Sequence, residues 1–564
     1  MRILNLFKEL DKKFRRRTVI IITLMFFAGI LEMIGVSLIL PLLTLLTGSL
    51  ESQSSYLNYI NSFIISINLD EDKLILYFII SISILYILKN SYLAFIYFLQ
   101  GKFIRDFQIK LGKKLLYAYL SMPVNQLSSR NSSIYIRNLS NDLVFLANSL
   151  TCYATLFLEG SIILLIVLML LITLPIFTLV IIIVFGFVTG LYIYLANKKI
   201  KVWGENRQLF ESEKIKSLKQ SIEFIREIKI YNISEYFLEK FNNSNFSFSQ
   251  SMFKHHFLQS LSKLWLEALT VFIIVLLLIF IISLASPIDS IPIIGLFAGA
   301  TFKLLPSLNR IINSLNQLKF VKPIENVFLS DLIAYNKSNQ KNIIEKNFNF
   351  KKEIIFKDVN FSYSNDKPII KNFNLKIVKG SVVGVFGSSG KGKSTFFDLL
   401  SGIQTPDSGK ILIDGKDLKY NISEWQNVLG YTHQDTIILD DSLKNNIAIG
   451  IQKNINIDSL IKSIEISELS KFVGENNDGL ETHISEKGSN ISGGQKQRIG
   501  IARTIYKNPE VLIFDEAFNS LDKITCDKIL NKISKNFSLK TIFIISHDTS
   551  LKDYCSQVID LDNL

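Results

Sequence analysis

A glycine-rich segment with two lysines carries the clearest chemistry in the sequence. Residues 387–395 read GSSGKGKST and follow the apolar run SVVGVF at 381–386. Glycines let backbone N–H groups wrap a phosphate, and a helix that begins there favours anionic oxygens. The pattern predicts a triphosphate site in which Lys393 reaches the β- and γ-phosphates and Ser394 binds Mg²⁺. The predicted binding residues are Gly387, Ser388, Ser389, Gly390, Lys391, Gly392, Lys393, Ser394 and Thr395.

A second apolar run, residues 511–514, ends in two acids, Asp515 and Glu516. A strand that brings carboxylates beside a phosphate loop can hold Mg²⁺ through Asp515. Glu516 is then placed to polarise an attacking water as a general base. Together the two segments predict hydrolysis of ATP with Mg²⁺ as cofactor.

Residues 490–498, NISGGQKQR, resemble the signature motif of ATP-binding cassette (ABC) proteins, with Ile491 where leucine is usual. A serine hydroxyl and glycine N–H groups at a helix start form an anion site. In that family the motif meets the γ-phosphate bound to the other subunit, so the resemblance implies a homodimer. It implies that four residues act on the partner's nucleotide: Ser492, Gly493, Gly494 and Gln495.

Five single residues match further positions of the ABC family. Tyr363 resembles the aromatic that stacks on adenine, and Glu486 resembles the acid of the exporter X-loop. Gln434 resembles the Q-loop glutamine that senses Mg²⁺ and water. Asp522 resembles the D-loop acid, and His547 the switch histidine that contacts the γ-phosphate. The resemblance therefore implies catalytic roles for Glu516, His547 and Gln434. It implies Mg²⁺ contacts for Ser394, Gln434 and Asp515.

The sequence departs from the usual ABC pattern at a few positions. Lys391 stands where the phosphate loop is more often small, and Ser485 replaces a usual glycine before Glu486. Residues 518–520, Phe-Asn-Ser, replace the common Thr-Ser-Ala of the D-loop. None of these changes removes a group that hydrolysis needs, so we expect an active ATPase.

The elements that position these residues occupy the second part of a chain whose first part is apolar. The chain has 564 residues, of which 48% are hydrophobic, and a net charge of +13. Several apolar runs reach the length of about 20 residues that a membrane-spanning helix needs. Pro175 divides the longest run in two. The predicted spans are approximately 18–48, 74–100, 145–173, 176–198, 264–285 and 291–318.

The loops predict the orientation. Residues 1–17 hold seven Lys/Arg against two acids, whereas residues 49–72 hold four acids and no basic residue. The positive-inside rule places the first stretch in the cytoplasm and the second outside. We therefore expect a multi-pass protein of the bacterial inner membrane with both termini and the nucleotide site in the cytoplasm. The basic excess then needs no nucleic-acid partner.

The expected architecture is a multidomain membrane protein. A six-helix, all-α ABC exporter transmembrane domain occupies residues 1–330, and 331–352 form a linker. An α/β phosphate-loop nucleotide-binding domain occupies 353–564. By resemblance the chain is a half-size ABC exporter.

Ionisable residues inside predicted spans suggest where a substrate binds. Charges in lipid are costly and usually face protein or water. Lys303 and Arg310 are seven residues apart on one helix face and, with Lys89, suggest a cationic cavity for a pyrophosphate-bearing substrate. The alternative is that such residues pair with acids in or near the spans, among them Glu32 and Glu159, or extend to the interface from helix ends.

Residues 56–69 form an amphipathic pattern that is too short to span and suits either a helix at the membrane interface or a helix packed on the first two spans. With LEMIGVSLILP in the first span and FKLLPSLNRII in the sixth, this chain is similar to bacterial lipid-linked oligosaccharide flippases. The resemblance implies ATP-driven flipping of a polyprenyl-pyrophosphate-linked oligosaccharide. Alternatives are export of another amphiphile (lipid A, a drug or a peptide), an ATP-gated channel, and a soluble ABC ATPase acting on DNA or ribosomes. The apolar segments argue against the last.

Overall fold

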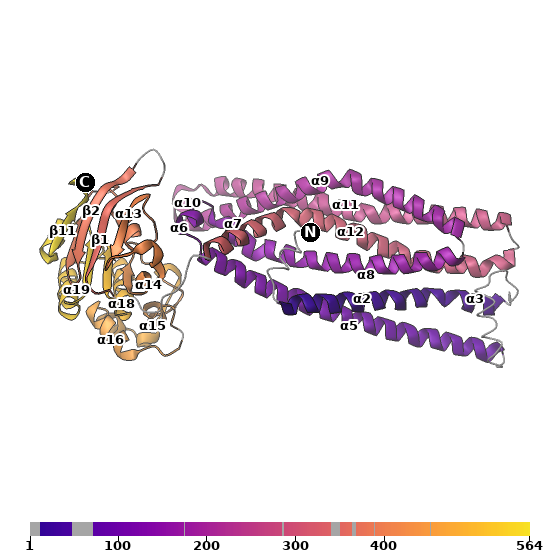
Figure 1. Cartoon of the computed structure of the whole chain (residues 1–564), viewed down its shortest axis with the longest axis horizontal. Helices are drawn as coiled ribbons and strands as arrows, with labels where there is room; N and C mark the ends of the chain where they lie inside the picture. The colour runs from indigo at the N-terminus through magenta and orange to yellow at the C-terminus, as the bar shows by residue number, and fades with distance from the viewer. Residues whose placement is uncertain are drawn as a thin grey trace. The chain divides into compact units, whose positions relative to one another are not determined.

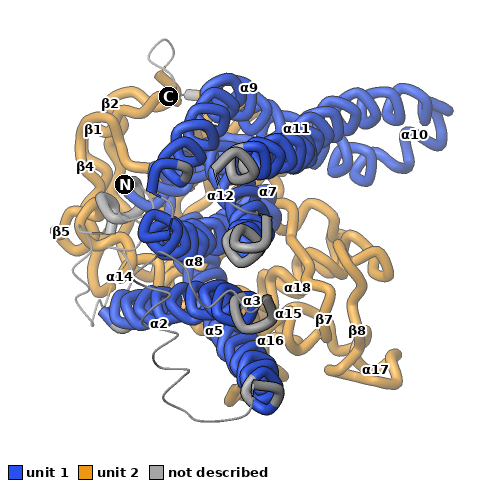
Figure 2. Tube along the Cα trace, turned by 90° about the vertical axis from the view of Figure 1, so that its right-hand side faces the viewer, with its two compact units in different colours: residues 1–122, 126–338 blue, residues 123–125, 339–564 orange. Residues whose placement is uncertain are grey.

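The computed structural model of the chain describes residues 12–47, 71–173, 175–284, 287–339, 350–363, 368–388, 390–451 and 453–563. They form two compact units, coloured separately in Figure 2: Met1–Met122 with Gln126–Ser338, and Pro123–Asn125 with Asn339–Leu564. The amphipathic segment predicted at 56–69 lies outside the described residues, and so does Ser389.

In the residues described, the regular structure of the first unit consists of helices joined by short turns, and its long helices run side by side in Figure 1. The long helices are α2 (Lys12–Ser37), α5 (Glu71–Leu120), α8 (Leu143–Thr173), α9 (Pro175–Glu223), α11 (Ser234–Leu284) and α12 (Pro287–Asn339). The shorter ones are α3 (Ile39–Thr47), α6 (Val124–Ser128), α7 (Ser132–Arg137), the π-helical turn η1 (Asn138–Asp142) and α10 (Ile225–Tyr231).

The long helices continue well beyond the apolar segments from which they were predicted. Helix α5 passes residue 100 and ends at Leu120, and α9 passes residue 198 and ends at Glu223. Helix α12 continues to Asn339, so the first part of the predicted linker is helical. Helix α8 ends at Thr173 and α9 begins at Pro175, the residue used to divide the long apolar run. Proline suits the first position of a helix, because the N–H group that it lacks would have no helical partner there.

Within the described residues, five helical stretches are long and apolar enough to cross a membrane, from Phe14–Leu43 to Ser234–Leu276. The stretch of α12 that holds the predicted sixth span is not one of them. Its sequence explains why, because residues 303–316 include Lys303, Arg310 and three asparagines. Such a helix is suited to face protein or water rather than lipid.

Helices α9 and α12 approach each other closely at a glycine. A Cβ atom added to Gly204 would lie 2.3 Å from the carbonyl oxygen of Phe320. The Phe320 side chain is buried and its ring stacks on His255 of α11, with 4.1 Å between ring centroids. Small residues permit this distance between helix backbones, so Gly204 fixes where three helices meet.

The second unit contains two sheets of different character. An antiparallel sheet has the order β2-β1-β4-β5, and a parallel sheet has the order β11-β3-β10-β9-β6. The antiparallel strands are β1 (Glu353–Ser362), β2 (Pro368–Val378), β4 (Ser408–Ile413) and β5 (Lys416–Asp417). The parallel strands are β3 (Val382–Phe386), β6 (Leu429–Thr432), β9 (Val511–Asp515), β10 (Thr541–Ile545) and β11 (Gln557–Asp560).

The remaining elements of the second unit are short helices and one small strand pair. The helices are α13 (Lys393–Leu400), α14 (Ile422–Asn427), α15 (Leu443–Ile447), α16 (Ile457–Ile466), α17 (Ser470–Glu475), α18 (Gly493–Tyr506) and α19 (Lys523–Asn536). Strands β7 (Asp441–Ser442) and β8 (His483–Ile484) pair with each other.

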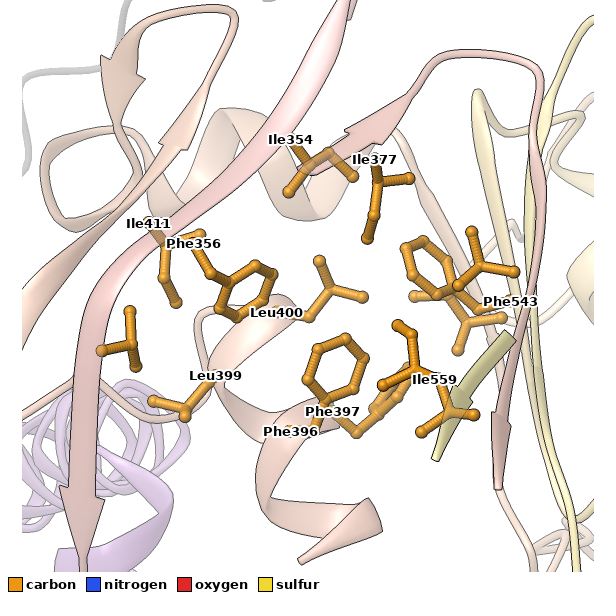
Figure 3. Packing of buried hydrophobic residues seen from close by; sticks show 14 of the residues in the cluster. Ile354, Phe356, Ile377, Phe396, Phe397, Leu399, Leu400, Ile411, Phe543 and Ile559 are labelled. Atoms are coloured by element: carbon orange, nitrogen blue, oxygen red, sulfur yellow. The ribbon is translucent and has the colours of Figure 1, made fainter. Parts of the chain in front are cut away.

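Helix α13 is the centre of the hydrophobic core of this unit. Figure 3 shows its residues Phe396, Phe397, Leu399 and Leu400 among buried side chains of both sheets. The Phe396 ring stacks on Phe356 of β1 at 5.2 Å and lies 6.4 Å from the ring of Phe543 in β10. Burial of large aromatic side chains on both sides holds α13 in place, and with it the loop that precedes this helix.

Candidate nucleotide site and membrane cavity

The parallel sheet brings the ends of four strands to one edge. Ile545 of β10 pairs with Val385 of β3 and with Asp515 of β9, and Thr432 of β6 pairs with Phe514. In open α/β sheets, ligands bind at the carboxyl ends of the strands. The phosphate loop, Glu516, Gln434 and His547 all follow these strands within a few residues, so the register places them along the same edge.

The phosphate loop lies between β3 and α13. Gly390 and Gly392 have positive φ angles of 84° and 94°, which glycine adopts without steric cost. Lys393 is the first residue of α13, and its Nζ donates to the carbonyl oxygen of Gly387 at 2.6 Å. The ammonium group therefore folds back over the loop, where it can donate hydrogen bonds to phosphate oxygens. Ser394 is exposed beside it.

Glu516 is contacted by residues of three predicted motifs. Its Oε2 accepts hydrogen bonds from Gln434 Nε2 at 2.8 Å and from Asn519 Nδ2 at 3.0 Å. Its Oε1 lies 3.9 Å from Lys393 Nζ. The phosphate-loop lysine, the Q-loop glutamine and the expected general base thus form one cluster. Sequence reasoning missed Asn519, which it treated only as a departure from the D-loop pattern.

The backbone at Glu516 is in a conformation that L-residues rarely adopt. Its φ is 48°, and its N–H donates to the carbonyl oxygen of Ile545 at 2.9 Å. Such left-handed residues cost about 1–3 kcal/mol and cluster at functional sites. The conformation turns the chain away from β9 directly after Asp515.

Asp515 is buried and accepts a hydrogen bond from the Tyr431 hydroxyl at 3.2 Å. Burial raises the pKa of its carboxyl, and the bond from Tyr431 opposes that rise. A buried carboxylate with the Ser394 hydroxyl and the Gln434 amide oxygen is a set of oxygen donors that suits Mg²⁺. When bound, the ion would neutralise phosphate charge. Sequence analysis did not single out Tyr431, because none of the motif positions marks a tyrosine on β6.

Tyr363 stands at the end of β1 with its side chain more than half exposed. Its hydroxyl donates to Asp398 at 3.3 Å, and Thr395 Oγ1 lies 3.5 Å from the Tyr363 hydroxyl oxygen. Both partners belong to α13. The tyrosine predicted to stack on adenine therefore lies beside the helix that follows the phosphate loop.

The signature segment contacts the D-loop of its own chain. Ser492 caps α18, and its Oγ accepts from the N–H of Gln495 while Gln495 Oε1 accepts from the N–H of Ser492. Atoms added at Gly493 and Gly494 would meet Ser520 first. In the part of the chain that the structure describes, the signature therefore faces the D-loop and not the phosphate loop.

Two further predicted residues lie at the surface. His547 is exposed two residues after β10, and Glu486 is exposed in the short turn η4 (Glu486–Gly488). Asp522 caps α19 by accepting from the N–H of Thr525 at 2.9 Å. The D-loop acid therefore has a structural function in helix capping whatever its role between subunits.

The three cations predicted to line a cavity in the first unit lie around one cavity of about 220 Å³. Each of them is paired with a buried carboxylate. Lys89 and Lys303 lie 3.0 and 2.7 Å from the two oxygens of Glu32. Arg310 makes a two-pronged contact with Glu159, at 2.5 and 3.1 Å. Sequence spacing suggested a cationic strip facing a cavity, with pairing to acids in the spans as the alternative. The structure shows that each of the three cations is paired with an acid of another helix.

The cavity still carries an excess of positive charge. Lys89, Lys303 and Arg310 face two carboxylates, Glu32 and Glu159. Both carboxylates are almost fully buried, whereas the Arg310 side chain is 45% exposed. Lys89 also lies 3.9 Å from the centre of the Tyr86 ring. Among the three cations Arg310 is the most exposed, and the Lys303 side chain is 27% exposed.

Family profiles match both units. The profile described as ABC transporter matches residues 370–519, and the ABC transporter transmembrane region matches residues 20–302. Since the second match alone spans half of the chain, the protein belongs to the ABC transporter family. It has one helical transmembrane domain followed by one α/β ATPase domain.

A solved structure confirms the exporter fold. The structure of a bacterial Atm1-family ABC exporter with ATP bound superposes with a TM-score of 0.77 at 18% identity and covers 98% of this chain and 94% of that one. The chain therefore has the arrangement of a half-size ABC exporter. At this identity the likeness concerns the fold alone.

Curated relatives match over a shorter stretch. The alpha-hemolysin translocation ATP-binding protein HlyB of Escherichia coli O157:H7 is 38% identical over 213 residues, which are 37% of this chain and 30% of that protein. The leukotoxin translocation ATP-binding protein LktB of Mannheimia glucosida is 36% identical over 212 residues, with the same shares. The matched part thus spans about a third of these relatives. The resemblance to lipid-linked oligosaccharide flippases is not confirmed by these matches.

Proposed function

We propose that this protein exports an amphiphilic substrate across the bacterial inner membrane and that ATP hydrolysis in a homodimer drives the export. The cluster formed by Lys393, Gln434 and Glu516 carries the proposal. Lys393 neutralises charge on the phosphates, and Glu516, oriented by Gln434 and Asn519, polarises the attacking water. Ser394, Gln434 and Asp515 would hold Mg²⁺, which would neutralise charge on the phosphates. The membrane domain then uses the energy to move its substrate outward.

The position of the signature supports a homodimer. Ser492 and its neighbours face the D-loop in their own chain, so a second chain is needed to bring a signature to the phosphate loop. A serine hydroxyl and helix N-terminal N–H groups supplied by the partner would complete the γ-phosphate contacts. ATP would then hold the two nucleotide-binding domains together until it is hydrolysed.

The membrane cavity favours a substrate with an anionic head group. Its excess positive charge and the exposed Arg310 guanidinium suit phosphate, which arginine binds through two parallel hydrogen bonds. A polyprenyl-pyrophosphate-linked oligosaccharide has this chemistry and is the first substrate to test. Lipid A shares the phosphate and the acyl chains and is the next.

A polypeptide substrate is the second candidate. The names of the relatives above describe translocation of hemolysin and leukotoxin, which are proteins. That observation favours a peptide, while the charge of the cavity favours a phosphate. An ATP-gated channel is the alternative from another class, and a persistent single-channel current in a planar bilayer would support it.

Proteoliposomes test the proposal directly. We expect ATP to drive a fluorescent polyprenyl-pyrophosphate oligosaccharide across the bilayer for wild type and not for Glu516→Gln. If ATP is hydrolysed while this lipid stays in place, lipid A and an unfolded peptide are tested in the same vesicles. Failure of ATP to move any of the three would contradict amphiphile export.

The role of the cavity in transport is best tested with a variant that leaves no buried charge without its ion-pair partner. Arg310→Ala by itself strands the Glu159 carboxylate, and we expect it to reduce transport more than basal ATPase activity. The double variant Arg310→Ala/Glu159→Ala removes the pair together. We expect it to keep basal ATPase activity and to lose transport on the order of tenfold or more, the value of a hydrogen-bonded charge. Transport at the wild-type rate would exclude this cavity from the substrate path.

A further inference from the structure

The segment that follows β11 borders the phosphate loop. Strand β11 runs parallel to β3, with Asp560 opposite Phe386. Two residues further along the two segments, Asp562 lies beside Ser388, the second residue of the phosphate loop. The side chain of Leu561 is buried in the core between them. A Cβ atom on Gly387 would stand 3.3 Å from that of Leu561, so the two segments are packed against each other.

Asp562 holds Ser388 through both polar groups of the serine. Its Oδ1 accepts from the Ser388 hydroxyl at 2.6 Å, and its two oxygens accept from the Ser388 N–H at 3.1 and 2.9 Å. These bonds, followed by the charges of Lys391 and Lys393, hold the pKa of Asp562 below its usual value. The carboxylate is therefore ionised at neutral pH and accepts all three bonds at once.

The serine that Asp562 holds also contacts the phosphate-loop lysine. Lys393 Nζ donates to the carbonyl oxygen of Gly387 at 2.6 Å and lies 3.4 Å from that of Ser388. The carboxylate thus fixes the first turn of the loop from one side, and the lysine contacts the same turn from the other. Asp562 belongs to none of the motifs that define the nucleotide site.

We infer that Asp562 is a positioning residue for the phosphate loop and that it raises the affinity for ATP by holding the first turn in its binding conformation. A loop that is ordered before binding loses less conformational entropy when the triphosphate arrives. The carboxylate acts through Ser388 and touches no phosphate. The rate of the hydrolysis step, which depends on Glu516, stays unchanged.

The negative charge of Asp562 near a triphosphate also lowers the affinity for ATP, because like charges repel. This effect opposes the gain in affinity from ordering the loop. The two effects differ in sign, so substitutions separate them. Asp562→Asn removes the charge and keeps an oxygen that accepts from Ser388. Asp562→Ala removes both. Ser388→Ala removes the hydroxyl donor and keeps the backbone N–H.

The test uses the full-length protein in nanodiscs, with steady-state ATPase kinetics and binding of a fluorescent ATP analogue to each variant. We expect Asp562→Ala to raise KM and the dissociation constant about three- to tenfold, as for the loss of charge-assisted hydrogen bonds. kcat should stay within about twofold, because the interaction is equal in the ground and transition states. Asp562→Asn should bind ATP at least as tightly as wild type.

A double-variant comparison tests the link through Ser388. Since both changes remove one interaction, Asp562→Ala/Ser388→Ala should be no weaker in ATP binding than Asp562→Ala alone. Asp553→Ala removes an exposed carboxylate from the neighbouring turn and controls for net charge. Tighter ATP binding by Asp562→Ala would show that only repulsion acts and would overturn the inference. A fall in kcat with unchanged KM would overturn it too.

Discussion

At the scale of single residues, three separate observations point to a catalytic role for Glu516. It follows a buried strand, adopts a left-handed backbone conformation, and accepts hydrogen bonds from Gln434 and Asn519. A carboxylate held by two amides is fixed in direction and keeps one oxygen for the lysine and the water. Gln434 lies in the loop after β6, and Asn519 lies in the loop after β9. We therefore expect changes in either loop to alter the orientation of Glu516 and the rate of hydrolysis.

Glu516→Gln should lower kcat by about 10²–10⁴-fold, the usual contribution of a general base. The amide still accepts from Gln434, so we expect ATP to bind with its wild-type affinity. Phosphate release measures the first effect and equilibrium binding of a fluorescent ATP analogue the second. Glu475→Gln, at an exposed position of α17, is the matched control. Wild-type turnover in Glu516→Gln would contradict the assigned base.

At the scale of elements, α9 and α12 approach each other closely at Gly204. Gly204→Ala places a methyl group 2.3 Å from the Phe320 carbonyl oxygen, which is closer than van der Waals contact allows. We expect a loss of stability of about 1–3 kcal/mol, the range for overpacked interiors. Thermal unfolding in detergent measures it.

Gly186→Ala is the control, because it lies in the same helix and an added Cβ there meets nothing within 4 Å. It should leave the unfolding temperature unchanged or slightly raised, since alanine favours helices over glycine. Equal unfolding temperatures for the two variants would show that the α9–α12 contact yields without cost.

The sequence predicted the elements well where a local pattern specifies them. The strand–loop–helix order of the phosphate site and the helix break at Pro175 depend on residues that are neighbours in the chain. Asn519 and Asp562 were missed because their partners, Glu516 and Ser388, become neighbours only through strand register or a left-handed turn. Likewise, spacing placed Lys303 and Arg310 on one face but did not reveal that Glu32 and Glu159 pair with them.

At the scale of the whole molecule, a complementation experiment tests the homodimer. Lys393→Ala disables the phosphate loop. Ser492→Asp keeps a good helix cap but sets a negative charge against the γ-phosphate. We expect homodimers of either variant to lose ATPase activity by at least about a hundredfold. A mixed dimer has one site with an intact loop and an intact signature, so it should recover hydrolysis.

Two affinity tags on the two variants allow the mixed dimer to be purified away from both homodimers. A mixture of separately purified homodimers that do not exchange subunits is the control and should remain inactive. Absence of activity in the purified mixed dimer would mean that each chain does not complete the other's site.

The ion pair of Glu32 also has a consequence for the order in which the helices are synthesised and inserted into the membrane. Helix α2 enters the membrane before its partner Lys89 has been synthesised, and a lone charge at the bilayer centre costs about 2.5–3.5 kcal/mol by insertion scales. Helix α5 brings that partner, and α8 then adds Glu159, whose partner Arg310 comes only with α12. A nascent chain that stops before α12 therefore has an unmatched acid in its membrane domain. Helix α12 therefore completes the charge pairing of the bundle, and we expect chains that end before it to be less stable in the membrane than the whole chain.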